Sequence, residues 1–288
     1  MGMIPRPFEL HSPATISEAI SLLKNKKDSK ILAGGQSLVP LMKLRLVSPA
    51  NLVDLGRIPG LSYIKMEREH LLIGSMTTHN EVAASSLVNK RCKTLSETAG
   101  NIGDQQVRNR GTIGGTICHA DPAGDIPAAV VALEAEFEVA GQRNRRVIKA
   151  KDFFVDMLTT SLRQSEILTE VRVPVLPPRS GGAYLKLGRG ASDLATVGVA
   201  AVITLDKAGA CKDARLGLAG VGSTPLRATR AEEVLKGQML SDDLMAEAGE
   251  KASEASNPSS DIRGSAEYKR EMVKVYVKRA IRQSLARV

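Results

Sequence analysis

The chain has 288 residues, 43% of them hydrophobic, and a net charge of +9, which suits about two folded domains and excludes global disorder. No apolar run approaches the ~18 residues that a transmembrane helix needs, so we expect no transmembrane segment. The three cysteines are far apart. This spacing excludes an all-cysteine zinc or iron–sulfur site on this chain alone and fits a reducing cytoplasm. The basic residues are dispersed and not interleaved with aromatic residues, so we expect no nucleic-acid binding.

The first ~57 residues predict a small α/β unit. Thr15 to Glu18 has the pattern of a capping box, which opens a helix. Residues 30–33 predict a strand, which Gly34 and Gly35 interrupt. A helical pattern begins at Ser37, and a further strand is expected at residues 51–55.

A second unit with mixed elements follows up to residue 176. We expect the segment from Gly111 to Thr116 to be a turn-rich interruption, because it contains a glycine pair. The apolar patterns predict a hairpin at 63–66 and 70–73, helices at 78–86, 93–102 and 127–133, and strands at 135–140 and 166–173.

The segment from Pro177 to Gly182 is rich in Pro and Gly and predicts a linker. Strands at 183–187, 196–205 and 214–219 then indicate an antiparallel meander, followed by helices at 228–236, 242–255 and 265–286.

The last of these helices has an apolar stripe surrounded by basic residues. Its composition favours a core-packed helix with a solvated basic face. Docking on an acidic partner or a membrane surface is the second interpretation. The stripe consists of Val273, Val277, Ala280 and Ile281, and the basic residues are Lys269, Arg270, Lys274, Lys278, Arg279 and Arg282.

Two glycine pairs lie where a phosphate could bind. Ala33 to Ser37 joins a predicted strand to a predicted helix, so its N–H groups could hold a phosphate. A plain tight turn explains this segment equally well. Thr112 to Thr116 repeats the pattern, and two such turns could grip opposite sides of a pyrophosphate. Neither segment matches the Rossmann fingerprint or the Walker A motif.

The segment from Cys118 to Asp125 carries further polar residues. Asp125 lies at a predicted helix start, so it is either an N-cap or an acceptor for ligand hydroxyl groups. His119, Asp121 and Asp125 do not make a convincing metal site, because no other ligand cluster converges on them. Cys118 has no base nearby in sequence, and we interpret it as a buried small residue.

Taken together, these motifs resemble the FAD-binding medium subunit of the molybdenum hydroxylase family, of the carbon monoxide dehydrogenase and aldehyde oxidoreductase type. The resemblance covers nearly the whole chain and depends on the order and spacing of its motifs. They are residues 33–38, 73–79, 106–115, 119–125, 166–168 and 220–227.

The resemblance implies an α+β fold. Residues 1–176 would form an FAD-binding domain of the PCMH and vanillyl-alcohol-oxidase type, with subdomains of about 1–57 and 58–176. Residues 177–288 would form a C-terminal domain of antiparallel sheet and helices, of the carbon monoxide dehydrogenase flavoprotein type.

The resemblance also implies roles for single residues in non-covalent FAD binding. The two glycine segments would hold the pyrophosphate through N–H groups, although the family often has Asn in place of Thr116. Asp125 would bind flavin-side hydroxyls, and Lys186 would lie near the isoalloxazine, where its charge could tune the flavin. Tyr184 and Asp193 are further candidates for ring contact. The implied cofactor-binding residues are Leu32, Ala33, Gly34, Gly35, Gln36, Ser37, Leu38, Ile102, Thr112, Ile113, Gly114, Gly115, Thr116, Ala120, Asp125, Leu168 and Lys186.

By the same resemblance, the chain would be one subunit of a heterotrimer, with a dimer of heterotrimers as a further option. A large subunit would carry the molybdenum cofactor, and a small subunit would carry two [2Fe–2S] clusters. The complex would oxidise an aldehyde such as glyceraldehyde, or carbon monoxide, and this chain would pass electrons to an external acceptor. The alternatives are a stand-alone FAD-dependent oxidoreductase of the same fold and a non-catalytic binding module.

Overall fold

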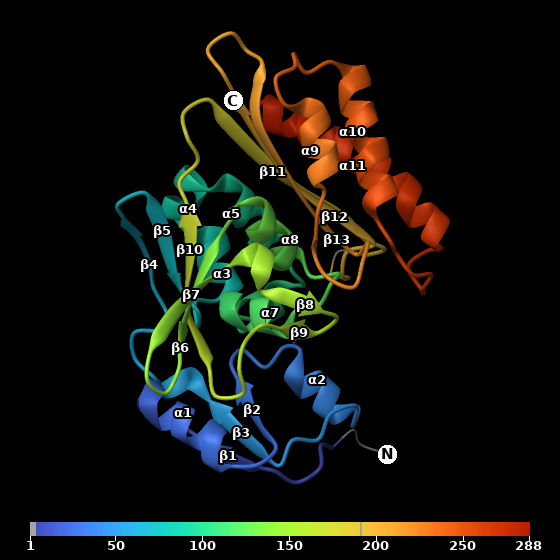
Figure 1. Ribbon diagram of the computed structural model, residues 1–288. Coiled ribbons are helices and arrows are strands. Elements are labelled where there is room, and N and C mark those ends of the chain that lie inside the picture. Colours follow the sequence, from blue (N-terminus) through green and yellow to red (C-terminus); the bar gives the residue numbers. More distant parts are fainter. Residues whose placement is uncertain (1–3, 191) are drawn as a thin grey trace.

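A computed structural model describes residues 4–190 and 192–288. Three sheets follow one another along the molecule, each with its own helices (Figure 1). The α+β class expected from the sequence is confirmed.

The first sheet is parallel, and its strands have the order β1 (Glu9–His11), β3 (Asn51–Asp54), β2 (Ser29–Leu32). Strand β1 was not predicted, because it is short and mostly exposed. The associated helices are α1 (Ile16–Asn25), α2 (Leu38–Lys43) and the 3-10 turn η1 (Leu55–Arg57). Thr15 caps α1 as predicted, but the Glu18 carboxylate accepts from Ala14 rather than from Thr15.

The second sheet is antiparallel and has five strands. In spatial order they are β4 (Ile64–Glu67), β5 (His70–Gly74), β10 (Ile167–Pro174), β6 (Glu136–Ala140) and β7 (Arg145–Lys149). A small hairpin of β8 (Phe154–Asp156) and β9 (Thr159–Thr160) follows the 3-10 turn η2 (Ala150–Asp152).

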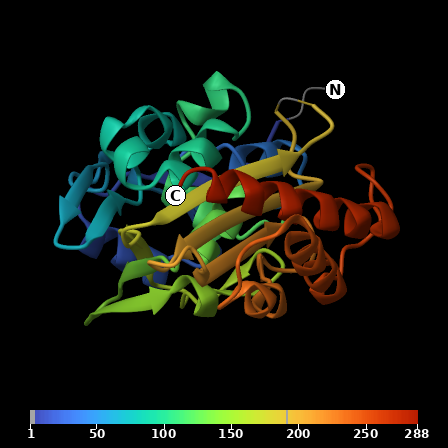
Figure 2. The ribbon, with the colours of Figure 1, turned by 90° about the horizontal axis from the view of Figure 1, so that it is seen from above.

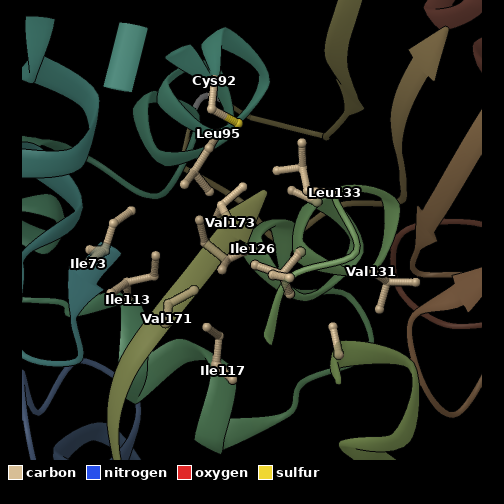
Figure 3. Close-up of a cluster of buried hydrophobic side chains, with 14 of the residues drawn as sticks. Ile73, Cys92, Leu95, Ile113, Ile117, Ile126, Val131, Leu133, Val171 and Val173 are labelled. Carbon is tan, nitrogen blue, oxygen red and sulfur yellow. The ribbon is translucent and has the colours of Figure 1, made fainter. Parts of the chain in front are cut away.

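Six helices accompany this sheet, and the largest core lies between them and it. Figure 3 shows Ile73 and Val171 from the sheet meeting Leu95, Ile117 and Ile126 from the helices. The helices are α3 (His79–Ala84), α4 (Ser86–Arg91), α5 (Lys93–Gly100), α6 (Gln105–Arg108), α7 (Ile113–His119) and α8 (Asp125–Ala132).

The predicted turn around Gly114 and Gly115 is wrong, because these residues begin helix α7. Their small size serves close packing instead of a turn. A Cβ on Gly114 would lie 2.6 Å from the Ser75 carbonyl oxygen. Neither of the two glycines has a positive φ.

The third sheet is the predicted antiparallel meander, lengthened by one short strand. It contains β11 (Ser180–Leu187), β12 (Val197–Leu205), β13 (Cys211–Ala219) and β14 (Leu226–Arg227). Helices α9 (Thr229–Leu235), α10 (Asp242–Ala255) and α11 (Ala266–Leu285) gather on one side of it, with α11 lying across β11 and β12 (Figure 2).

The predicted linker ends earlier than expected, because Gly181 and Gly182 belong to β11. A Cβ on Gly181 would meet the Ser284 carbonyl oxygen at 2.1 Å, and one on Gly182 would meet the Thr94 hydroxyl at 2.3 Å. The glycines therefore let β11 pack tightly between α11 and α5.

The core-packed interpretation of the last helix is confirmed, since Val273, Val277 and Ile281 are fully buried. Lys269 departs from the expected solvated face. It is buried, and it pairs with Asp261 at 2.9 Å while donating to the Ser259 carbonyl. Within residues 4–190 and 192–288, no helix is both long and apolar enough to cross a bilayer.

Candidate functional site

The first glycine segment forms one wall of a cavity of about 380 Å³. Gly35 has a φ of +75°, a conformation that favours glycine. Gly34 touches the backbone of the loop before α7, where a Cβ would lie 2.1 Å from the Arg110 carbonyl oxygen. The cavity is lined by Leu32, Ala33, Gly34, Gly35, Gln36, Val39, Pro40, Lys43, Asp54 and Arg110.

The amide groups of this segment are its most distinctive feature. Within the described part of the chain, none of the six N–H groups of residues 33–38 has a protein acceptor. Residues 33–36 all line the cavity. Consecutive free N–H groups of this kind make an anion-binding surface.

The second glycine segment lies beside the first but differs from it in chemistry. A Cβ on Gly115 would lie 3.5 Å from the Cβ of Ala33. The N–H groups of residues 113–116 already have acceptors. Ile113 donates to Thr77, Gly114 to Ser75, Gly115 to the Thr112 hydroxyl and Thr116 to the Thr112 carbonyl. The first segment is therefore the better phosphate cradle of the two.

Three charged residues of the cavity were missed by the sequence reasoning. Lys43 and Arg110 are exposed and form no ion pair with any described residue. Asp54 accepts from the Gly56 N–H at 2.9 Å through Oδ1. A clue existed in the chain order, since Asp54 ends the strand that follows the glycine turn, as the acidic residue does in dinucleotide-binding βαβ units.

Asp125 is the centre of a second, buried polar group. Its side chain is 4% exposed; Oδ1 accepts from the Tyr184 hydroxyl at 2.5 Å, and Oδ2 pairs with Lys186 Nζ at 2.9 Å. Lys186 also donates to the Asn101 carbonyl at 3.1 Å. The N-cap interpretation of Asp125 is wrong, because Gly124 occupies that position and Asp125 is the first helical residue.

Burial governs the protonation of this group. It raises the pKa of Asp125, while the neighbouring Lys186 charge acts in the opposite direction. Burial and the Asp125 carboxylate raise the pKa of Tyr184 well above its ordinary value, so its hydroxyl is a donor. Gly198 makes room for that hydroxyl, since a Cβ there would lie 2.4 Å from it. The resemblance implied that Asp125, Tyr184 and Lys186 all lie near the flavin, but no local pattern predicted that they bond to one another.

The other predicted residues fall in different places. Ile102 adjoins the carbonyl that binds Lys186 and packs against the main core. Ala120 is buried with a φ of +54° and ends α7. Leu168 is buried in β10, so its side chain faces packing partners. Asp193 is paired with Arg263 at 2.9 Å.

A buried histidine supports the second glycine segment and was also missed. His79 is 1% exposed, and its Nε2 lies 2.8 Å from the Thr116 hydroxyl. Its Nδ1 has no partner, and burial lowers the pKa of His79 to about 4. The neutral ring therefore fixes the Thr116 side chain.

Neither a metal site nor a reactive thiol is formed by the segment from Cys118 to Asp125. In the described ranges, no group of three or more His, Cys, Asp or Glu side chains is placed to hold a metal. Burial raises the pKa of Cys118 to about 12, which disfavours the nucleophilic thiolate.

A larger cavity of about 810 Å³ lies on the second sheet and includes strands β4, β5 and β10. Two of its arginines are already bound to glutamates. Arg172 pairs with Glu170 at 2.6 Å and with Glu138, which also binds Arg145. Because these arginines are already paired and several glutamates also line the cavity, it is a weaker candidate for an anionic ligand than the glycine cavity.

Comparison with known proteins places this architecture in the class of FAD-binding flavoproteins. Residues 6–176 match the family described as FAD binding domain in molybdopterin dehydrogenase. Residues 182–284 match the CO dehydrogenase flavoprotein C-terminal domain. The chain belongs to this family of FAD-binding subunits of molybdenum hydroxylases.

Known relatives align with this chain over nearly the full length of both sequences. The carbon monoxide dehydrogenase medium chain of Hydrogenophaga pseudoflava is 40% identical over 99% of both chains. The glyceraldehyde dehydrogenase medium chain of Sulfolobus acidocaldarius is 37% identical, over 98% of this chain and 99% of that one. A solved structure of carbon monoxide dehydrogenase from Hydrogenophaga pseudoflava matches with a TM-score of 0.96 and 42% identity, covering 98% of this chain and 99% of that chain.

Proposed function

We propose that this chain carries non-covalently bound FAD as the electron-transfer subunit of a molybdenum hydroxylase that oxidises an aldehyde or carbon monoxide. The observation that carries the proposal is the row of free N–H groups at residues 33–38, which lines a cavity with two unpaired cations. Such a surface suits the pyrophosphate of a dinucleotide. When bound, FAD supplies the redox chemistry, and the protein supplies its position and electrostatics.

The proposed cofactor site has two regions. The segments 32–38 and 112–116, which lie side by side, would hold the pyrophosphate end. Asp125 and Lys186, with Ile102 beside them, would serve the flavin end, where the Lys186 ammonium supplies a fixed positive charge. Ala120 and Leu168 would offer backbone groups, because their side chains are buried. We propose 1–176 and 177–288 as the domains that meet at this site.

The names of the relatives support a multi-subunit complex. Several are named medium chains or subunits, so members of this family work in multi-subunit complexes. We propose a large subunit with the molybdenum cofactor and a small subunit with two [2Fe–2S] clusters, assembled as a heterotrimer or a dimer of heterotrimers. A cytoplasmic location fits the three free cysteines.

The test is purification of the complex through this chain, with a visible spectrum and identification of the flavin released by heat. We expect FAD, iron–sulfur absorbance and two co-purifying chains. Activity with glyceraldehyde and with carbon monoxide, in the presence of an artificial electron acceptor, would then identify the substrate. FAD on a lone, fully active chain would instead indicate a stand-alone flavoenzyme. A folded complex that holds no flavin and cannot be reconstituted with FAD would refute the proposal.

A further inference from the structure

The glycine cavity contains a carboxylate at a defined position. Strands β2 and β3 are parallel neighbours, and Leu32 pairs in register with Asp54. The turn that follows Leu32 and the Asp54 side chain therefore lie at the same edge of the sheet. Asp54 Oδ1 accepts from Gly56, whereas no described group donates to Oδ2. A carboxylate with a free oxygen at this edge can accept from a sugar hydroxyl.

The same cavity carries an excess of positive charge. Lys43 and Arg110 both line it, and neither is paired with an acid in the described ranges. This differs from the larger cavity, where Arg145 and Arg172 are bound to glutamates. Two unpaired cations beside a row of free N–H groups suit a diphosphate better than a neutral ligand.

We propose that Lys43 and Arg110 bind the diphosphate, that Asp54 binds the adjacent ribose hydroxyls, and that these side chains select FAD over FMN. The inference rests on the proposed function and adds side-chain ligands to a site otherwise made of backbone groups. FMN lacks the AMP half of FAD and keeps only one of the two phosphates, so it would lose the ribose contact to Asp54 and part of the phosphate contact to Lys43 and Arg110. A cavity of about 380 Å³ is within the range of small-molecule pockets.

Binding of ADP, FAD and FMN to the flavin-depleted full complex tests the inference by calorimetry and flavin fluorescence. We expect ADP to compete with FAD. Lys43→Met and Arg110→Met should each weaken FAD and ADP by roughly 10- to 100-fold, the effect of losing one charge-assisted hydrogen bond. FMN, which keeps one of the two phosphates, should be weakened less than FAD. Lys65→Met, in the larger cavity, is the matched control and should alter neither ligand.

The ribose contact has its own test. The unmodified complex should bind ADP more tightly than 2′,3′-dideoxy-ADP, and Asp54→Asn should remove this preference. The amide oxygen of Asn can still accept from Gly56, so the fold is expected to persist, and circular dichroism checks this. Because Lys43 and Arg110 are exposed, their variants should also fold.

The outcomes separate this inference from the proposed function. Tight FAD binding without ADP competition, or with unchanged affinity in both cation variants, overturns the side-chain assignment and leaves the FAD function standing. Equal binding of ADP and its dideoxy form overturns the role of Asp54. Failure of the folded complex to bind FAD, ADP or FMN refutes both proposals.

Discussion

Replacing Lys186 by Met tests the buried polar group at the boundary of the two matched family regions. The side chains of Lys186 and Asp125 are only 9% and 4% exposed. Met keeps most of the apolar stem but removes the charge, which leaves the Asp125 carboxylate buried with Tyr184 as its remaining side-chain donor. Breaking a buried pair on one side costs about 3–5 kcal/mol. We expect a loss of unfolding free energy of that order at pH 8.

The loss of unfolding free energy caused by Lys186→Met should be larger at high pH than at low pH. Burial raises the pKa of Asp125 above its ordinary value of 3.8, so the folded chain holds that proton more tightly than the unfolded chain. The associated stability is therefore greatest below the ordinary value and is lost as the pH rises through the raised pKa. Removing Lys186 raises this pKa further, because the lysine charge opposes the shift. The deficit of the variant should be smaller at pH 5 than at pH 8.

Urea unfolding of both forms at pH 5, 6.5 and 8 measures this difference. Lys236→Met is the matched control, because Lys236 pairs with Asp213 at 3.3 Å but is 49% exposed. Such a surface pair contributes at most about 1 kcal/mol. A Lys186→Met variant that loses no more stability than the control, or whose deficit shrinks as the pH rises, would refute the reasoning.

Three further predictions concern other contacts. Gly34→Ala places a Cβ 2.1 Å from the Arg110 carbonyl oxygen, so it should cost about 1–3 kcal/mol of unfolding free energy and reduce FAD retention. Gly100→Ala is the control, because its added Cβ would lie 3.9 Å from the nearest atom, and it should not destabilise the chain. Melting curves and flavin content compare the two variants. Arg287→Ala removes both bonds to Glu97 (2.8 and 2.6 Å) and should cost about 1.5–3 kcal/mol in urea unfolding; a loss below ~0.5 kcal/mol would contradict this. Burial raises the pKa of Cys92 to about 12, so a thiol reagent at pH 8 should label Cys92 slowly in the folded chain and fast in urea. Rapid labelling of the folded chain would show that the thiol is accessible and would contradict this prediction.

The sequence was most informative where a pattern is local. The helix starting at Ile16 and the meander of the third sheet follow from periodicity and caps. Strands β7, β8 and β9 were missed because β8 and β9 have only three and two residues and β7 and β9 are mostly polar. The glycine pair at 114 and 115 was misinterpreted, since a glycine needed for close packing looks the same in sequence as one needed for a turn.

The candidate site, too, was predictable only where a local sequence pattern encodes it. The glycine turn at residues 33–38 could be predicted as a candidate phosphate site because its pattern is local, and its N–H groups are free in the described part of the chain. The bond from Tyr184 to Asp125 joins residues 59 positions apart, and its geometry depends on the space left by Gly198. No local pattern encodes such a contact, so only the three-dimensional structure could supply it.

The position of β10 has a consequence for synthesis of the chain. This strand joins β5 on one side and β6 on the other, although the chain reaches it only after β7, β8 and β9. Until residue 174 has left the ribosome, the hairpins β4–β5 and β6–β7 each keep an unpaired edge, and open edges invite pairing with other chains. A nascent chain stalled before β10 is therefore the form most in need of a chaperone, and truncation before Ile167 should yield aggregates instead of a smaller domain.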